Sequence, residues 1–503
     1  MNVCKDLKPQ KVFQFFEEIC SIPHGSRNTK QISDYCAAFA KERKLTYYQD
    51  ENNNIIILKP GTPGYESSEP VIIQGHMDMV CEKEADREID FAKEGLSLYV
   101  DGDFLRARGT TLGGDDGIAI AYAFAILDSD DLPHPPLEVV ITVDEEIGML
   151  GAESIDVSML KGRRMLNIDS DVEGSFLISC AGGLRADCRI PVSFCEIEGA
   201  QYELTLHGLL GGHSGGEINK ERANAIVVSG RILKALQDEI GIRLTDLRGG
   251  LMDNAIPREV TMMLTVPEER EEALAKAVEK WDGILKKEYQ TSDPDITLSL
   301  NAVGSGSVQA LDRSSMVKVL LFLRNIPHGI QNMSMDIPGL VETSLNPGIM
   351  KLVKAEAADT GTASSGAEAE VVQEAPYFQV SFSVRSSVTS RKYDVTDRLI
   401  FLTEFLGGEV GISGDYPAWE YKADSVVREL MADCYRDLYG KEPKIQAIHA
   451  GLECGILSGK LPGLDCISFG PDNFDIHTPQ ERLSISSTER VWNLIVEFLK
   501  RAK

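Results

Sequence analysis

No stretch of this sequence is apolar for long enough to cross a membrane. A membrane-spanning helix needs about 20 consecutive apolar residues, and the apolar runs here are much shorter. The first residues, MNVCKDLKPQKVFQFFEEIC, also lack the basic segment and apolar core of a secretory signal. These two absences predict a protein with no membrane partner and a cytoplasmic location.

Closely paired cysteines are also missing. The chain has ten cysteines, spread from Cys4 to Cys466, and no CxxC pair. This usage differs from a disulfide framework and is typical of free thiols in a reducing compartment. We therefore expect the cysteines to be core residues.

Basic residues are too few to balance the acidic ones. The 51 lysines and arginines stand against 78 aspartates and glutamates, which gives a net charge of -27 at pH 7. A charge of this sign repels the phosphates of nucleic acids and anionic lipid surfaces. It predicts no nucleic-acid partner, and it leaves carboxylates available to bind cations.

The first part of the chain contains short β-type runs that alternate with helical patterns. At 503 residues, with 43% apolar residues, the chain is long enough for two or three domains. VIIQG (71–75) and LEVVITV (137–143) indicate buried strands, and KQISDYCAAFAKER (30–43) has helical periodicity. This alternation predicts an α/β fold in which helices sandwich a mixed, largely parallel sheet.

The middle of the chain has a different pattern. Amphipathic strands such as EVTMMLTV (259–266) alternate there with surface helices, which predicts an inserted α+β lid domain with antiparallel strands. The segment AEAADTGTASSGAEAE (355–370) has few bulky apolar residues and is expected to be an exposed loop. The expected boundaries are 1–188 and 413–503 for the catalytic domain and 189–412 for the inserted lid domain.

The end of the chain is expected to return to the catalytic domain. CISFG (466–470) indicates a strand, and an amphipathic helix follows, with Ser486 and Glu489 in the pattern of a capping box. One face of this helix is apolar. Its residues are Val491, Leu494, Ile495, Phe498 and Leu499.

Four polar clusters lie where strands or turns of the catalytic domain end: GHMD (75–78), GGDDG (113–117), DEE (144–146) and NIDS (167–170). Ligands of open α/β sheets collect at the carboxyl ends of the strands. Carboxylates that converge there repel one another unless cations neutralise them. Imidazole and carboxylate ligands without thiolates favour Zn²⁺, Mn²⁺ or Co²⁺ in an open catalytic site.

Eight motifs, in their order along the chain, resemble those of the M20 metallopeptidase family. They are GHMDMV, LGGDDGIAIA, VDEEIGMLGA, NIDSDVEG, GGHSGGEI, NAIPRE, HAGLECG and HTPQER. Within this family the sequence is most similar to the aminoacyl-histidine dipeptidase branch, over essentially the full chain. The resemblance implies a zinc-exopeptidase fold, hydrolysis of Xaa-His and other dipeptides, and two divalent metal ions, with Zn expected ahead of Mn or Co.

The resemblance also implies roles for individual residues. Asp115 resembles the carboxylate that bridges the two ions, and its peptide bond to Asp116 is expected to be cis. Glu145 resembles the general base, and Asp78 resembles the catalytic-site carboxylate that orients a metal-ligating histidine. The other implied ligands are His76 and Asp169 for one ion, and Glu146 and His477 for the other.

Five more residues resemble substrate-binding groups. In the lid, His213 would donate to the oxyanion, and Asn254 and Arg385 would hold the substrate's carboxylate. Without the resemblance, each of these three residues could equally have a purely structural role, in capping a turn, bonding a loop or lying on a solvated edge. His449 and Glu453 are expected to line the pocket for the substrate's amino terminus, where an acidic group attracts an ammonium.

Two other functions remain open at this point. An N-acyl-amino-acid amidohydrolase of the same family would use the same metal chemistry but would not need a free substrate amine. A non-catalytic metal-binding relic would have no need for Glu145 as a base. The expected partners are dipeptide substrates and a second copy in a homodimer, and His213 could act in its own or in the partner's active site.

Overall fold

The computed structural model describes residues 3–354 and 375–503, so the loop predicted at 355–370 lies outside the described residues. The chain divides into two compact units, Met1–Cys180 with Pro417–Lys503, and Ala181–Tyr416. The sequence-based boundaries after residues 188 and 412 fall inside strands β9 (Gly182–Pro191) and β19 (Glu409–Tyr416) of the second unit. Both crossings therefore lie at strand ends, where the sequence shows no break in pattern.

The first unit is built on a mixed sheet. Its strand order is β1-β2-β6-β3-β7-β21-β8-β20. Four neighbouring pairs are parallel (β6/β3, β3/β7, β7/β21 and β8/β20), and three are antiparallel, which confirms the predicted sheet. The strands are β1 (Thr46–Gln49), β2 (Ile55–Lys59), β3 (Val71–His76), β6 (Leu137–Thr142), β7 (Arg164–Asn167), β8 (Ser175–Cys180), β20 (Lys444–Ile448) and β21 (Asp465–Ser468).

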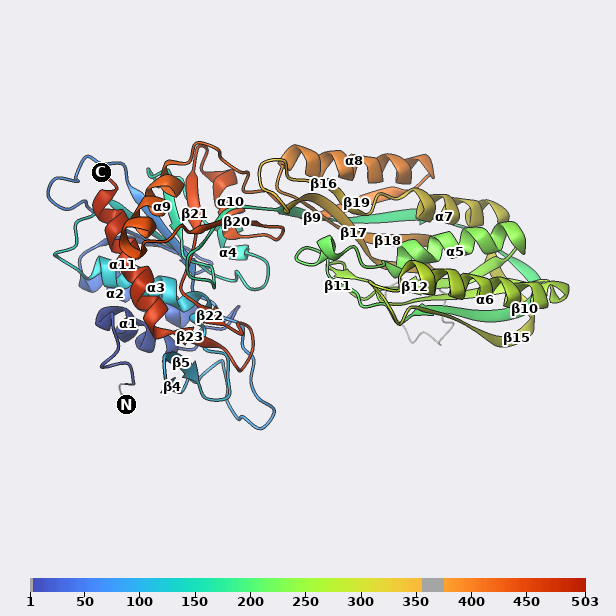
Figure 1. Ribbon diagram of the computed structural model, residues 1–503, viewed down its shortest axis with the longest axis horizontal. Coiled ribbons are helices and arrows are strands. Elements are labelled where there is room, and N and C mark those ends of the chain that lie inside the picture. Colours follow the sequence, from blue (N-terminus) through green and yellow to red (C-terminus); the bar gives the residue numbers. More distant parts are fainter. Residues whose placement is uncertain (1–2, 355–374) are drawn as a thin grey trace, which may run out of the picture. The chain divides into compact units, whose positions relative to one another are not determined.

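Helices cover both faces of this sheet (Figure 1). Successive side chains of a strand point to opposite faces. Ile55 and Ile57 accordingly enter one apolar core, while Ile56 enters the other. The first core holds α1 (Gln10–Cys20), α2 (Lys30–Glu42), α3 (Gly114–Leu127), α9 (Val426–Tyr439) and α11 (Ile485–Arg501); the second holds α10 (Glu453–Lys460), which contacts α4 (Leu150–Ser154).

Helix α3 lies in the interior of the first unit. Every residue from Ile118 to Leu127 is buried, as expected of a helix that is apolar all round. Phe124 stacks on Phe39 of α2 with ring centroids 3.8 Å apart. This packing fixes the helix whose first turn carries Asp115.

Helix α11 confirms the predicted apolar face, since all five of its predicted residues are buried. The predicted capping box is wrong. The helix begins at Ile485, and its N-cap is Ser484, whose Oγ accepts a hydrogen bond from the N–H of Ser487 at 3.2 Å. The physical reason is its position: Ser486 is already the second residue of the helix, and its hydroxyl donates to Asp103 at 2.7 Å.

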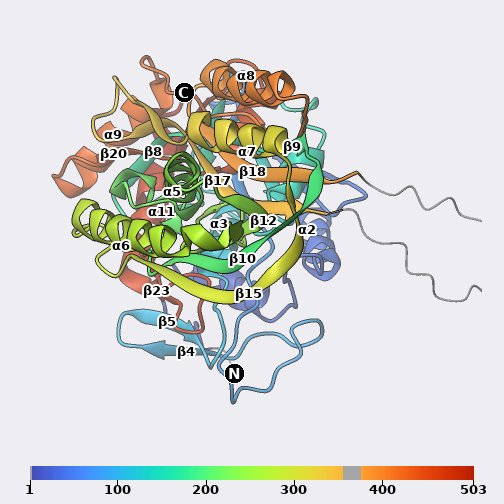
Figure 2. The same cartoon turned by 90° about the vertical axis from the view of Figure 1, so that its right-hand side faces the viewer.

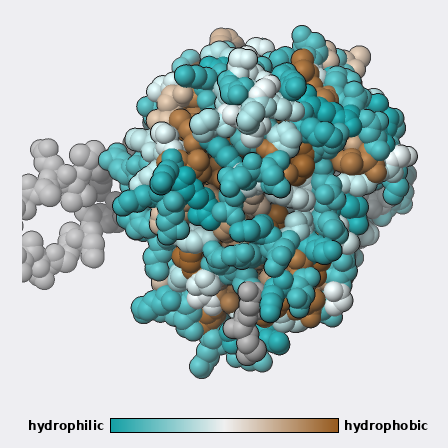
Figure 3. All heavy atoms as spheres, turned by 90° about the vertical axis from the view of Figure 1, so that its left-hand side faces the viewer, coloured by the Kyte–Doolittle hydropathy of each residue, from teal (hydrophilic) through white to brown (hydrophobic). Residues whose placement is uncertain are grey.

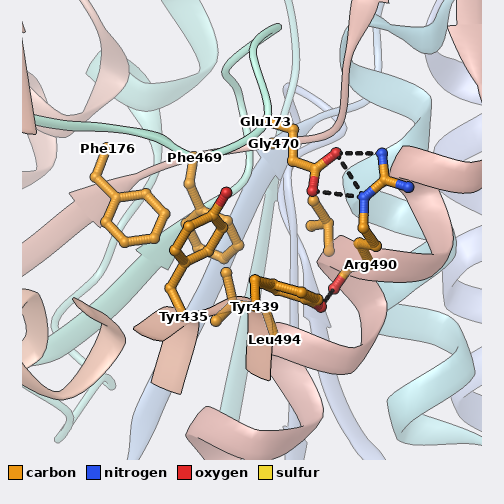
Figure 4. A pocket seen from close by; sticks show the side chains of 10 residues that line it. Glu173, Phe176, Tyr435, Tyr439, Phe469, Gly470, Arg490 and Leu494 are labelled. Carbon is orange, nitrogen blue, oxygen red and sulfur yellow. Dashed lines mark hydrogen bonds and ion pairs between the residues drawn. The ribbon is translucent and has the colours of Figure 1, made fainter. Parts of the chain in front are cut away.

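An ion pair holds α11 against the sheet. Arg490 of α11 donates hydrogen bonds from Nε and Nη2 to the Glu173 carboxylate, at 2.6 to 2.9 Å (Figure 4). The hydroxyl of Tyr439, from α9, donates to the backbone oxygen of Arg490 at 2.5 Å. Two neighbouring elements are thus tied to the same turn of α11.

The second unit is an α+β domain with antiparallel pairing, as predicted. Its sheet has the order β15-β10-β14-β12-β17-β18-β9-β19, with β16 beside β17. Helices α5 to α8 share one core with this sheet, and Figure 2 shows α5, α6 and α7 over its strands. The bounds are β10 (Phe194–His207), α5 (Ala225–Glu239), β12 (Arg243–Gly249), β14 (Val260–Val266), α6 (Glu271–Glu288), β15 (Thr297–Leu311), α7 (Arg313–Asn325), β16 (Gly329–Met333), β17 (Val341–Val353), β18 (Tyr377–Ser386) and α8 (Thr389–Phe405).

Short elements complete the two units. The first unit has a four-stranded sheet of β22 (Asn473–Phe474), β23 (Arg482–Ser484), β5 (Phe104–Ala107) and β4 (Leu98–Asp101), in that order. The second unit has the pair β11 (Gly212–His213) and β13 (Ala255–Ile256), and the 3-10 turns η1 (Ile218–Lys220) and η2 (Glu268–Arg270).

The surface and the cysteines agree with the composition. The face in Figure 3 is mostly hydrophilic, with scattered apolar side chains. All ten cysteines are free and eight are buried, while Cys195 is half-buried and Cys81 is exposed. Within residues 3–354 and 375–503, no helix combines the length and the apolar character that crossing a membrane would require.

Candidate metal centre

The candidate site lies at the carboxyl ends of β3, β6 and β7. These three strands are parallel neighbours, so the residues that follow them share one edge of the sheet. His76 ends β3, and Glu145 and Glu146 follow β6. Asp169 follows β7. The edge therefore receives an imidazole and three carboxylates from three strands.

Two further groups reach this edge from other elements. Asp115 lies in the first turn of α3, and the peptide bond between Asp115 and Asp116 is cis, as expected. His477 lies in the loop between β22 and β23 and has φ +62°, in the left-handed region that non-glycine residues rarely adopt. Such backbone conformations persist where the surroundings hold them, and they occur often at functional sites.

Asp115 lies between the two histidines. Its Oδ1 is 3.1 Å from His76 Nε2, and its Oδ2 is 3.2 Å from His477 Nε2. His477 Nε2 is also 3.1 Å from Glu146 Oε1, and His76 Nε2 is 3.8 Å from Asp169 Oδ1. The structure thus brings together all five residues that the resemblance implied as ligands.

Three overlapping groups in this cluster place their ligand atoms within 4.8 Å of one another. They are Asp115, Glu146 and His477; His76, Asp116 and Asp169; and His76, Glu145 and Glu146. The first group matches one implied metal position. The second contains Asp116, which was not predicted as a ligand and whose Oδ2 accepts the backbone N–H of His76 at 3.3 Å.

The charges of the site favour a cation. Burial raises the pKa of the Asp169 carboxyl, and burial together with nearby carboxylates raises the pKa of Glu145 to about 8. Hydrogen bonds to Asp115 and Glu146 raise the pKa of His477 to about 10. In His76, bonds to Asp115 and Asp78 raise the pKa although burial opposes the rise. A buried cluster of anions that draws positive charge, with oxygen and imidazole donors, fits divalent metal ions.

Asp78 supports the site through its backbone and its carboxylate. His76 Nδ1 lies 2.9 Å from the backbone oxygen of Asp78 but 3.5 Å from its carboxylate, so the carbonyl makes the closer contact. The fully buried carboxylate accepts the N–H of Glu145 at 3.0 Å and the hydroxyl of Ser26 at 2.8 Å. Asp78 therefore fixes the backbone at Glu145 through its carboxylate and the ring of His76 through its carbonyl oxygen.

A solvent-open cleft with a volume of about 280 Å³ adjoins the cluster. Its lining includes Glu145 and His477 together with the apolar side chains of Leu177, Ile448 and Leu452. A small substrate could therefore contact the polar cluster and apolar surface at the same time.

Glu453 and His449, the two residues expected near the substrate's amino terminus, are not among the residues that line this cleft. Glu453 is fully buried, and its carboxylate accepts hydrogen bonds from Gln74 Nε2 and, at 2.7 Å, from the Thr142 hydroxyl. Gln74 in turn accepts from Asn167 Nδ2 at 2.6 Å. Glu453, the first residue of α10, is thus bonded to side chains of β3 and β6. His449 is also buried.

Glu481 and Asn473 are parts of the site that sequence reasoning missed. Glu481 accepts backbone N–H bonds from the turn before Asp115, and Asn473 Nδ2 donates to the same carboxylate. Burial raises the pKa of Glu481, and these bonds oppose the rise. The only signal was the place of Glu481 in HTPQER, four residues after His477.

The second unit brings its three predicted residues into one neighbourhood. His213 in β11 pairs with Ala255 in β13, and the N–H of Ser214 donates to the backbone oxygen of Asn254 at 2.8 Å. Arg385 of β18 lies opposite Ser344 of β17, and Asn346 of the same strand donates to the backbone oxygen of Ala255 at 2.9 Å. Burial, and then the charge of Arg385, lowers the pKa of His213. A neutral imidazole, a guanidinium and an asparagine thus lie together on one unit.

Comparison with known proteins agrees with these features. Residues 72–501 match the Peptidase family M20/M25/M40. The chain is 35% identical over 502 residues to the cytosol non-specific dipeptidase of Escherichia coli (strain K12), covering 99% of both chains. The solved structure of the aminoacylhistidine dipeptidase from Vibrio alginolyticus is 35% identical, with a TM-score of 0.89 over 99% of this chain and 98% of that one.

A more distant structure shares the fold. An aminopeptidase from Bacillus cereus is 14% identical, with a TM-score of 0.58 over 99% of both chains. The family match covers most of the chain, and the full-length relatives agree with the resemblance that the motifs carry. This chain therefore belongs to the M20/M25/M40 peptidase family.

Proposed function

We propose that this protein hydrolyses the peptide bond of dipeptides, Xaa-His among them, with two divalent metal ions. The observation that carries the proposal is Asp115, whose two carboxylate oxygens each face a different histidine, at 3.1 and 3.2 Å. A ligand shared by two ions needs this two-sided geometry. The names of the two full-length relatives support dipeptide substrates, and that of the Escherichia coli protein supports a cytoplasmic location.

In the proposed site, Asp115 would be a ligand of both ions. His76 and Asp169 complete one set, and Glu146 and His477 complete the other. When bound, the ions would lower the pKa of a water molecule and polarise the carbonyl of the substrate. Imidazole and carboxylate donors favour Zn²⁺, with Mn²⁺ or Co²⁺ as the other candidates.

Glu145 is proposed as the general base. Its carboxylate takes a proton from the attacking water while the new carbon–oxygen bond forms. It then gives this proton to the leaving nitrogen as the carbon–nitrogen bond breaks, and so returns to its starting state. Asp78 holds Glu145 in place through the hydrogen bond to its backbone N–H.

The second unit offers groups suited to the substrate's carboxylate and oxyanion. His213 Nδ1 accepts the N–H of Gly215 at 3.2 Å and of Gly216 at 3.1 Å. A neutral ring that accepts at Nδ1 carries its proton on Nε2, and this N–H is the donor that an oxyanion requires. Arg385, whose buried Nε lacks a hydrogen-bond partner among the described residues, is proposed with Asn254 to bind the carboxylate.

The test uses metal-free protein reconstituted with Zn²⁺, Mn²⁺ or Co²⁺ and offered Ala-His, Leu-Gly and N-acetyl-Ala. We expect amine release from the dipeptides and none from the acetylated compound. Hydrolysis of N-acetyl-Ala alone would identify an N-acyl-amino-acid amidohydrolase instead. No hydrolysis of either dipeptide with any of the three ions would refute the proposal.

We also propose a homodimer. Phe401 and Phe405 lie one turn apart on α8 and are 75% and 73% exposed. Large apolar side chains that are exposed together are typical of interfaces. Sedimentation equilibrium should show a dimer that is weakened by Phe401→Asp, and a monomer at all concentrations would contradict this proposal.

A further inference from the structure

The turn that carries Asp115 is held by a carboxylate from the far end of the chain. Glu481 Oε2 accepts the N–H of Leu112 at 2.7 Å and of Gly113 at 3.1 Å. Its Oε1 accepts the N–H of Gly114 at 2.9 Å and, more weakly, of Asp115 at 3.4 Å. Glu481 itself is 3% exposed. Four consecutive backbone donors therefore converge on one buried side chain.

Helix α3 needs such an acceptor. The first N–H groups of any helix have no partner within the helix, and an N-cap side chain normally accepts one of them. The N-cap of α3 is Gly113, which has no side chain and lies in the left-handed region with φ +68°. Glu481 takes over this task, and its charge suits the positive end of the helix.

The same carboxylate is tied to the loop that carries His477. Asn473 Nδ2 donates to Glu481 Oε1 at 3.1 Å, and the N–H of Glu481 donates to the Thr478 oxygen at 3.1 Å. Asn473 pairs with Leu483 across β22 and β23, so Asn473 and Glu481 bracket the loop that contains His477. Glu481 therefore connects the turn before Asp115 with the base of the His477 loop.

The space around this connection is closed. A Cβ atom on Gly114 would lie 2.8 Å from Asn473 Nδ2, and one on Gly113 would lie 3.0 Å from Met79 Sδ. Both distances are too short for a comfortable contact, so the turn packs directly on its neighbours. A change in the Glu481 side chain must then move either this turn or the His477 loop.

We infer that Glu481 is a positioning residue that fixes Asp115 and His477 relative to each other, so that both can hold the same metal ion. The inference rests on the proposed function for the ligand roles of these two residues. A glutamine has only one acceptor oxygen, and its NH₂ group would point at backbone N–H groups. Glu481→Gln therefore keeps the volume of the side chain but breaks about half of its bonds.

The test is a titration of the metal-free protein with Co²⁺, followed by visible absorption, which reports the geometry of the ligands. Glu489 is exposed on α11 and provides the matched control Glu489→Gln. We expect the wild type and Glu489→Gln to bind two equivalents with the same spectrum. Glu481→Gln should bind Co²⁺ about 10- to 100-fold more weakly, with an altered spectrum, because residues that support ligands have effects of this size.

Equal Co²⁺ affinity and spectrum in Glu481→Gln and the wild type would overturn the inference alone, even if the melting temperature fell. No uptake of Co²⁺ by the wild type would overturn the proposed function and the inference with it. If Glu481→Gln does not fold, Asn473→Ala removes one of the five bonds and serves instead. It should weaken Co²⁺ binding by a smaller factor, and wild-type binding by Asn473→Ala would overturn the inference.

Discussion

The neighbouring glutamates Glu145 and Glu146 allow a sharp test of the mechanism, because the same substitution should reduce turnover at one position and metal binding at the other. Loss of a general base costs about 10² to 10⁴ in rate, or about 3 to 5 kcal/mol in the activation barrier. Glu145→Gln should therefore reduce kcat by that factor. Glu146 Oε1 contacts His477 at 3.1 Å, so Glu146→Gln should instead weaken the binding of one ion.

Glu145→Gln should leave the fold intact. Burial, and then the nearby carboxylates of Glu453, Glu146 and Asp115, raise the pKa of Glu145, which means that its negative charge is disfavoured in this place. A neutral amide of the same shape removes this repulsion, so the metal-free variant should be at least as stable as the wild type. Glutamine also keeps the backbone N–H that Asp78 accepts.

The assay compares both variants with the wild type after reconstitution with Zn²⁺. Turnover of Ala-His is measured at saturating substrate, metal content by atomic absorption and melting temperature by calorimetry. A Glu145→Gln variant that keeps kcat within tenfold of the wild type would refute its role as the base. Loss of one metal equivalent from this variant would place Glu145 among the ligands instead.

Three other measurements test the packing and the metal dependence. Phe124→Ala removes a fully buried ring that stacks on Phe39, and urea unfolding should show a loss of about 3 to 5 kcal/mol, whereas a loss below about 1 kcal/mol would contradict the described core. Arg490→Ala breaks the bidentate ion pair with Glu173. Because the arginine side chain is 41% exposed, the free energy of unfolding should fall by about 1 kcal/mol. The control Lys500→Ala, at the exposed pair with Glu497, should change it hardly at all. EDTA should abolish dipeptide hydrolysis and lower the melting temperature, and Zn²⁺ should restore both. The reason is that ions present at 100 times their Kd stabilise a fold by about 2.7 kcal/mol. An unchanged melting temperature would argue against a bound ion.

The parts of the site that follow from the sheet could be predicted from the sequence. His76 ends a buried strand, Glu146 and Asp169 follow two others, and parallel strands place such residues at one edge. The position of His477 has no such basis, because it lies in a loop with a left-handed backbone and no periodic pattern. Only the resemblance to a family pointed to it.

Contacts between distant segments were the hardest to predict. Glu481 binds the turn at Leu112 and Gly113 across hundreds of residues, and no local pattern encodes such a bond. For Glu453, the sequence of a short helix did not reveal which face turns towards Thr142. In both cases, tertiary packing decided the environment of a carboxylate that the motif alone left open.

Strand β21 gives the first unit an unusual order of assembly. It lies between β7 and β8, yet the ribosome makes it only after the entire second unit. Throughout that interval the newly made β7 has an unpaired backbone edge, and such edges invite pairing with other chains. Completion of this sheet must therefore wait until the whole second unit has been synthesised, and during that interval the edge of β7 depends on other parts of the chain for protection.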